Sequence, residues 1–154
     1  RNTTFLNSVR KYNLFTFKSL PSAFWAGVRV IHLDEESCTT TVKLNWFTKN
    51  PFKSMFWAIQ GMAAELATGL PITLEIREAE QPISMLVLNN KANFSKKARG
   101  RIHFVCKDRA RVKEAVAKTI ATNESQTVWL TSVGTDQAGD VVSTFKFEWT
   151  LKAK

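Results

Sequence analysis

The chain has 154 residues, 44% of them hydrophobic, and carries a formal net charge of +9 at pH 7. This length and composition suit one folded domain, residues 1–154, and exclude a disordered chain. The positive charge is compatible with nucleic acid, an anionic membrane or a phosphorylated small molecule as partner.

Several other classes of protein are also disfavoured. Two cysteines, Cys38 and Cys106, are too few for a disulfide framework, and we expect two buried free thiols. No metal-ligand spacing occurs, so neither a metal nor another cofactor is predicted. Residues 54–74 have Glu65 as their only charged residue, but polar residues and Pro71 interrupt this stretch, and no transmembrane span is predicted. The first residues lack a signal-peptide pattern, which favours a cytoplasmic protein.

The first elements expected are a helix and a β-hairpin. An apolar stripe predicts a helix reaching to about Phe15 and ended before Pro21, so residues 1–20 form a helical extension. Residues 24–33 alternate as a strand, and a turn of three acidic residues follows. A second strand over residues 38–47 is expected to bury one face, formed by Val42, Leu44 and Trp46.

A long, nearly uncharged helix is predicted next. Ser54 is a plausible N-cap, and apolar residues recur at helical spacing to form a stripe typical of a core: Met55, Ile59, Met62 and Leu66. Another face of the helix is small and flat and carries one carboxylate: Ser54, Ala58, Gly61, Glu65 and Gly69. Residues 71–80 are expected to form a short second helix or an irregular turn.

The second half of the chain contains most of the predicted strands. Residues 83–94 are apolar on both faces at their centre, which is typical of a central strand. Residues 101–107 alternate as another strand, and Asp108 precedes a helix over residues 110–121. A hairpin closes the chain, with its turn at residues 134–140. Antiparallel strands segregated from the helices indicate the α+β class.

Three segments resemble hotdog-fold proteins of the PaaI-like thioesterase group, in particular a branch described as a domain of unknown function. Residues 50–69 (NPFKSMFWAIQGMAAELATG) resemble the asparagine loop and central helix of that group. Residues 92–107 and 139–152 resemble the strands that follow, and the resemblance covers roughly residues 15–152. It implies a curved antiparallel sheet wrapped around the long helix. It also implies a homodimer or dimer of dimers, with acyl-thioester sites at the dimer interface.

The resemblance also implies roles for individual residues. Glu65 stands where the group has its catalytic Asp or Glu, and Asn50 matches the loop asparagine that orients water or substrate. The other substrate-binding residues expected at the start of the helix are Ser54, Trp57, Ala58 and Gly61. A basic cluster is expected to bind the phosphates of an acyl-coenzyme A: Lys96, Lys97, Arg99 and Arg101.

Each assignment has a structural alternative. Glu65 suits the wet edge of a helix, Asn50 is common in turns before proline, and the basic cluster suits a solvated turn. Many PaaI-like enzymes begin this helix with His-Gly-Gly, whereas this chain has Phe56-Trp57-Ala58. The predicted function is therefore acyl-CoA thioester hydrolysis or, as the alternative, binding of an acyl-CoA or lipid-like ligand without catalysis. Nucleic-acid binding is disfavoured because Phe145, Phe147 and Trp149 share a face that lacks basic residues.

Overall fold

The computed structural model describes residues 2–154, with side chains from Ser8 onward. It contains four helices and six strands, and all strand pairs are antiparallel, which confirms the α+β prediction. The elements are α1 (Asn2–Ser19), α2 (Pro21–Trp25), β1 (Arg29–Leu33), β2 (Cys38–Lys43), α3 (Trp57–Glu78), β3 (Ile83–Phe94), β4 (Arg101–Cys106), α4 (Arg109–Thr122), β5 (Gln126–Thr135) and β6 (Val141–Ala153).

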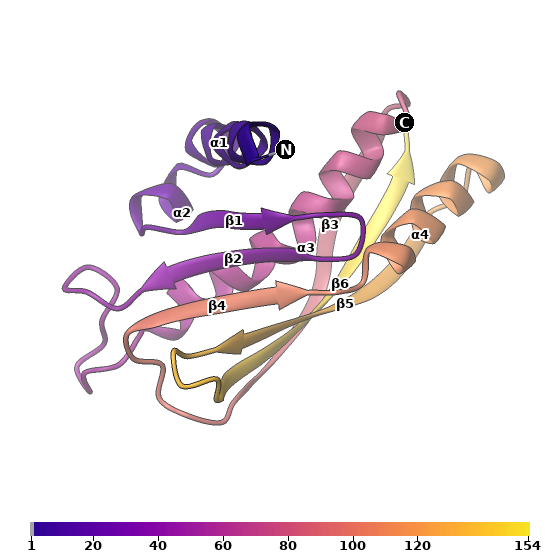
Figure 1. The fold of residues 1–154 in the computed structure, drawn as a ribbon. Helices are drawn as coiled ribbons and strands as arrows, with labels where there is room; N and C mark the ends of the chain where they lie inside the picture. Colours follow the sequence, from indigo (N-terminus) through magenta and orange to yellow (C-terminus); the bar gives the residue numbers. More distant parts are fainter. Residues whose placement is uncertain (1) are drawn as a thin grey trace.

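The six strands form one curved sheet in the order β1-β2-β4-β5-β6-β3. Figure 1 shows α3 running behind this sheet. Helix α4 lies next to α3 and β5, and α1 lies beside β1. The inward side chains of β6 alternate as predicted, and they form much of the core with α3: Ser143, Phe145, Phe147, Trp149 and Leu151.

Polar contacts as well as apolar packing fix α3 against the sheet. The buried Thr40 hydroxyl donates to the carbonyl oxygen of Ala63 at 2.7 Å, and the Ser143 hydroxyl donates to Gln60 Oε1 at 2.7 Å. Buried polar groups require such partners, because an unsatisfied one loses its hydration without compensation. The contacts therefore set one position of α3 along the strands.

Helix α3 departs from the sequence prediction at both ends. It begins at Trp57 with Phe56 as N-cap, so the predicted cap at Ser54 is wrong; Ser54 is buried in the preceding loop. The helix also continues through Pro71 to Glu78. Pro71 removes one backbone donor, but Pro71 and Ile72 are both buried, and this packing outweighs the break expected from the sequence alone.

The segment before β1 is also helical where a strand was predicted. Pro21 stands in the first turn of α2, where its missing N–H costs no hydrogen bond. Gly27 follows the helix with a φ of 90°, a conformation that glycine adopts without strain. The strand consequently begins at Arg29 rather than at residue 24.

Strand β2 is shorter than predicted. It ends at Lys43, and Asn45 then starts a turn by accepting hydrogen bonds from the amides of Phe47 and Thr48. The alternation of the strand therefore does not reach Trp46, which was expected to be buried but is 80% exposed.

The two edges of the sheet differ. Strand β1 is covered by α1, since the Asn13 side chain donates to the carbonyl oxygen of Val30 and accepts from its amide at 3.1 and 2.8 Å. Strand β3 has no strand along its outer side within residues 2–154. The prediction of a central position for β3 is therefore wrong for a single chain, and Leu86 and Leu88 are exposed.

Candidate functional site

Glu65 lies at an apolar cavity between α3 and the two N-terminal helices. The cavity has a volume of about 350 Å³, and its other lining residues include Phe15, Leu20, Met62, Leu66, Met85 and Trp149. Glu65 reaches solvent, but the surrounding apolar atoms remove part of its hydration, and this burial raises its pKa above the ordinary value of 4.5. The arrangement gives one carboxylate with increased basicity beside a space suited to an apolar chain.

The small residues of α3 have separate roles. A methyl group at Gly69 would lie 3.2 Å from Cζ2 of Trp149, so glycine allows the indole to approach the helix at this cavity. Gly61, expected to contact substrate, lies instead against the ring of Phe145, where an added methyl would be 3.7 Å from Cε1. Gly61 therefore belongs to the packing of helix against sheet.

Asn50 holds the loop that leads into α3. Its Oδ1 accepts from the amide of Phe52 at 2.9 Å and from that of Ser54 at 3.3 Å, while its Nδ2 donates to Ser54 Oγ at 3.0 Å. Together with Trp57, Asn50 and Ser54 line a second hollow of about 390 Å³. The asparagine therefore has a structural function and also borders an open site.

Asn50 and Glu65 do not share a cavity in one chain. Glu65 borders the cavity between α3 and the N-terminal helices, whereas Asn50 borders the hollow at the start of α3. Eight residues separate Trp57 from Glu65, which is about 12 Å along a helix axis. One chain therefore presents two separate halves of the predicted site.

The start of α3 has free donor capacity next to bulky side chains. Phe56 at the N-cap makes no side-chain cap hydrogen bond, and the first amides of a helix lack partners within it. The rings of Phe56 and Trp57 are edge to face with centroids 6.1 Å apart, and both are exposed; Ala58 is half-buried. The helix thus begins at two exposed aromatic residues.

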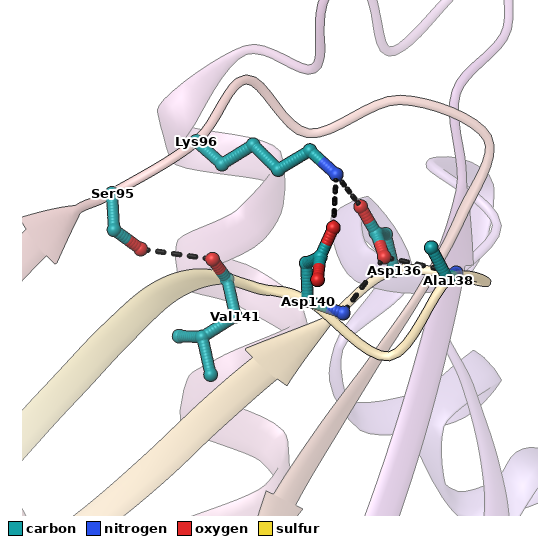
Figure 2. Close-up of polar contacts among 6 residues, drawn as sticks. All are labelled: Ser95, Lys96, Asp136, Ala138, Asp140 and Val141. Atoms are coloured by element: carbon teal, nitrogen blue, oxygen red, sulfur yellow. Dashed lines mark hydrogen bonds and ion pairs between the residues drawn. The ribbon is translucent and has the colours of Figure 1, made fainter.

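The predicted basic cluster is divided between paired and open side chains. Figure 2 shows the Lys96 ammonium between Asp136 Oδ2 and Asp140 Oδ2, each at 2.7 Å. The hydrogen bonds that Lys96 donates to Asp136 and Asp140 raise the pKa of Lys96, and the two carboxylates balance its charge. Lys96 thus joins the segment after β3 to the turn between β5 and β6.

Within the described part of the chain, no carboxylate forms an ion pair with the remaining basic residues of the cluster. Lys97 has its Nζ 5.9 Å from the centre of the Phe52 ring, and Arg101 donates to Thr41 Oγ1 at 3.3 Å. Arg99 is exposed on the adjoining loop. Lys97 also borders the hollow that Asn50 lines, so positive charge is available there.

The two cysteines lie opposite each other across β2 and β4. Cys38 and Cys106 are free and buried, as predicted. Burial raises the pKa of each thiol to about 12, so neither supplies a thiolate nucleophile near neutral pH.

The part of the chain that the structure describes contains no group of three or more residues suited to holding a metal ion. The helices within residues 2–154 include none that is long and apolar enough to cross a membrane.

The contribution of the N-terminal helices to the Glu65 cavity was missed from the sequence. Phe15, Leu20 and Pro21 line this cavity, although residues 1–20 were expected to be an extension of the domain. The apolar character of Phe15 and Leu20 was a usable signal, but nothing local indicates which helix they meet.

A curved antiparallel sheet around one long helix is the hotdog fold, as the resemblance implied. The chain belongs to the family described as Domain of unknown function (DUF4442), whose model matches residues 15–151. No curated protein matches it in sequence.

Solved structures support the fold assignment. A protein of unknown function from Chlorobaculum tepidum is 15% identical, with a TM-score of 0.81 over 96% of this chain and 95% of that one. One described as a probable thioesterase, from Pseudomonas aeruginosa, is 18% identical, with a TM-score of 0.76 over 90% and 91%. A thioesterase from Haemophilus influenzae is 12% identical, with a TM-score of 0.72 over 94% and 90%.

Proposed function

We propose that this protein is a cytoplasmic, cofactor-independent thioesterase that hydrolyses an acyl-CoA-type thioester. The observation that carries the proposal is the position of Glu65, a partly dehydrated carboxylate at the mouth of an apolar cavity. A carboxylate with a raised pKa is a better base, and a thioester with an apolar acyl chain needs both a base and an apolar space. Structural relatives named as thioesterases support the same reaction class.

In the proposed reaction, Glu65 accepts a proton from a water molecule as the water oxygen attacks the thioester carbonyl carbon. The carbon–sulfur bond then breaks, the protonated Glu65 returns its proton to the leaving sulfur, and the products are a carboxylic acid and the free thiol of coenzyme A. The amides at the start of α3 are suited to stabilise the negative oxygen, because free N–H groups and the positive end of the helix dipole meet there.

The two halves of the site are proposed to come together in a homodimer. Glu65 and the start of α3 are too far apart in one chain to act on the same carbonyl, so Glu65 of one subunit would face Asn50 and Trp57 of its partner. The open edge of β3, with Leu86 and Leu88 exposed, supports edge-to-edge pairing of two chains.

The phosphate groups of coenzyme A are proposed to contact Lys97, Arg99 and Arg101. These side chains border or adjoin the hollow at the start of α3 and are not held by carboxylates. Lys96, which was included in this cluster from the sequence, is assigned a smaller part because Asp136 and Asp140 already balance its charge.

The decisive experiment measures thiol release from acyl-CoA substrates of short, medium and long chain length. Wild-type protein is expected to release thiol from at least one substrate, and Glu65→Gln is expected to lower kcat/KM by about 100-fold or more. Glu78→Gln, on an exposed turn of the same helix, is the matched control and should retain activity. Thiol release from none of the substrates, or equal rates for wild type and Glu65→Gln, would refute this function.

The bulky start of α3 favours a second candidate function, namely binding of an acyl-CoA without turnover. Phe56 and Trp57 are bulky and exposed at the start of α3, and Trp57 stands where many PaaI-like enzymes have a glycine. Calorimetry with acyl-CoA separates the two functions, since binding without thiol release supports this candidate. Absence of any rise in melting temperature with coenzyme A compounds would argue against both functions.

A further inference from the structure

The loop between β2 and α3, residues 44–56, exposes four large aromatic side chains, and three of them are more than half exposed. Trp46 is 80% exposed, Phe52 70% and Phe47 61%. Figure 1 shows this loop projecting beyond the end of β2. Scattered exposed apolar residues are normal, but several gathered on one projecting loop are typical of a surface that binds a partner.

Side-chain hydrogen bonds hold the backbone of this loop, and its aromatic side chains are exposed rather than buried in the core. Asn45 Oδ1 accepts from the amides of Phe47 and Thr48 at 2.9 and 3.1 Å. The buried Thr48 hydroxyl donates to the carbonyl oxygen of Lys43, and the Asn50 side chain holds the second half of the loop. The rings are therefore presented outward from a fixed framework.

The charged residues of this loop are all positive. No Asp or Glu occurs between Glu36 and Glu65 in the sequence, whereas Lys43, Lys49 and Lys53 lie in this interval and are all exposed. The loop is therefore both aromatic and basic.

A second basic segment lies beside the loop. The amide of Met55 donates to the carbonyl oxygen of Ala98 at 2.9 Å, and Arg101 pairs with Lys43 across β4 and β2. These contacts bring Lys97, Arg99 and Arg101 to the same end of the molecule. Asp136 and Asp140 are paired with Lys96, the residue just before this segment.

We propose that this surface, Trp46, Phe47 and Phe52 together with Lys43, Lys49 and Lys53, docks on an anionic phospholipid membrane. Aromatic rings are favoured at the boundary between headgroups and acyl chains, and lysine stems lie along apolar surface while their ammonium groups contact phosphates. The association is peripheral and requires no spanning helix.

Charge and shape favour a lipid surface over two other occupants. A second copy of the same loop would bring like charges together, which opposes self-association. Single-stranded nucleic acid stacks on rings arranged along a basic groove, whereas Trp46 and Phe47 are adjacent residues at the tip of a reverse turn. An anionic membrane surface can contact the projecting aromatic side chains and the lysines around them at the same time.

The test is co-sedimentation with vesicles of phosphatidylcholine alone or with one third phosphatidylserine. We expect binding to the anionic vesicles, weak binding to the neutral ones, and loss of binding as sodium chloride rises. The triple variant Trp46→Ser, Phe47→Ser, Phe52→Ser and the double variant Lys49→Glu, Lys53→Glu are each expected to lower the vesicle partition constant at least tenfold.

Matched controls are available elsewhere on the chain. Trp25→Ser removes a ring that is 74% exposed on α2, and Lys118→Glu reverses an exposed charge on α4; both should bind vesicles like wild type. All variants replace exposed side chains, so unchanged circular dichroism melts establish that they are folded. Glu65→Gln should bind vesicles normally, which separates this proposal from the proposed hydrolysis.

Three results would overturn the proposal. These are no sedimentation with anionic vesicles, equal loss of binding in the loop variants and their controls, or a change of oligomeric state in the loop variants, which would assign the rings to an interface between copies. Single-stranded DNA that binds more tightly than the anionic vesicles and loses its affinity in the same variants would assign the surface to nucleic acid instead.

Discussion

The indole Nε1 of Trp149 donates a 3.0 Å hydrogen bond to Thr68 Oγ1, and both side chains are buried. The same hydroxyl donates to the carbonyl oxygen of Glu65, so it joins α3 to β6 next to the candidate carboxylate. Thr68→Val keeps the shape and removes the hydroxyl, leaving the indole donor unsatisfied. We expect a loss of about 1–3 kcal/mol in the free energy of unfolding, measured with urea. The exposed Thr127→Val is the control and should change stability by less than about 0.5 kcal/mol.

A buried ion pair gives a second prediction. Arg109 Nη2 lies 3.0 Å from Glu75 Oε1, with the side chains 8% and 12% exposed, and Arg109 also donates to the carbonyl oxygen of Asp34. Arg109→Met alone leaves the Glu75 carboxylate poorly hydrated and unpaired, so we expect a loss of about 3–5 kcal/mol in denaturant unfolding. The double variant Arg109→Met, Glu75→Leu removes both charges and should recover most of this loss. An equal loss in the double variant would show that the charge pair is not the cause.

The packing of β4 on β5 gives a third prediction. A methyl group at Gly134 would lie 2.5 Å from Cε1 of the fully buried Phe104 ring, so Gly134→Ala forces the ring to move. The expected cost is about 1–3 kcal/mol in the free energy of unfolding. Phe104→Leu introduced into the Gly134→Ala protein should cost less than it does in wild type. As a control, Gly61→Ala meets Phe145 at an ordinary 3.7 Å and should be neutral or stabilising, because alanine favours helix.

The environment of Glu65 predicts a specific pH dependence. Burial raises the native pKa above 4.5, so the native chain keeps this proton to a higher pH than the unfolded chain does. The contribution of protonated Glu65 to the free energy of unfolding is therefore present at low pH and is lost as pH rises through the native pKa. Relative to wild type, Glu65→Gln should become more stable from about pH 4 upward, with a plateau above the native pKa. Urea unfolding at a series of pH values measures this difference, and a difference that falls with rising pH would contradict the assignment.

The pairing of Lys96 predicts unequal effects within the basic cluster. Arg99→Ala removes an exposed cation without a carboxylate partner and should lower the affinity for coenzyme A several-fold. Lys96→Ala removes a charge already balanced by Asp136 and Asp140, and should lower affinity less. Calorimetric titration measures both, with Lys118→Ala as a control on α4. A larger loss of affinity for Lys96→Ala than for Arg99→Ala would show that Lys96 contacts coenzyme A.

The order of elements was predictable from the sequence because most strands carry their own burial pattern. In β6, Phe145, Phe147 and Trp149 alternate with exposed or half-buried residues, and the structure buries all three. Trp46 and Phe24 were predicted incorrectly because the same alternation continues beyond the strand. Strand β2 ends because Asn45 forms local hydrogen bonds that start a turn. Strand β1 begins later than predicted because a helix begins at Pro21. In both places the local structure outweighs the periodic pattern.

The candidate site was less predictable than the fold. Glu65 is the only charged residue of residues 54–74, and in the structure its burial among apolar neighbours raises its pKa. The separation of Glu65 from Asn50 and the capture of Lys96 by Asp136 depend on contacts between residues distant in sequence. A pattern of neighbouring residues carries no information about such contacts.

The side chain of Asn13 has a consequence for how far chains can associate. By occupying the amide and carbonyl of Val30, it supplies β1 with the hydrogen bonds that another strand would otherwise make there. The sheet thus has one closed side and one open side, β3. Addition of a second chain along β3 uses up the open sides of both molecules. Addition of strands from further chains therefore stops at two molecules. The Asn13 side chain thus disfavours an open-ended polymer of paired strands.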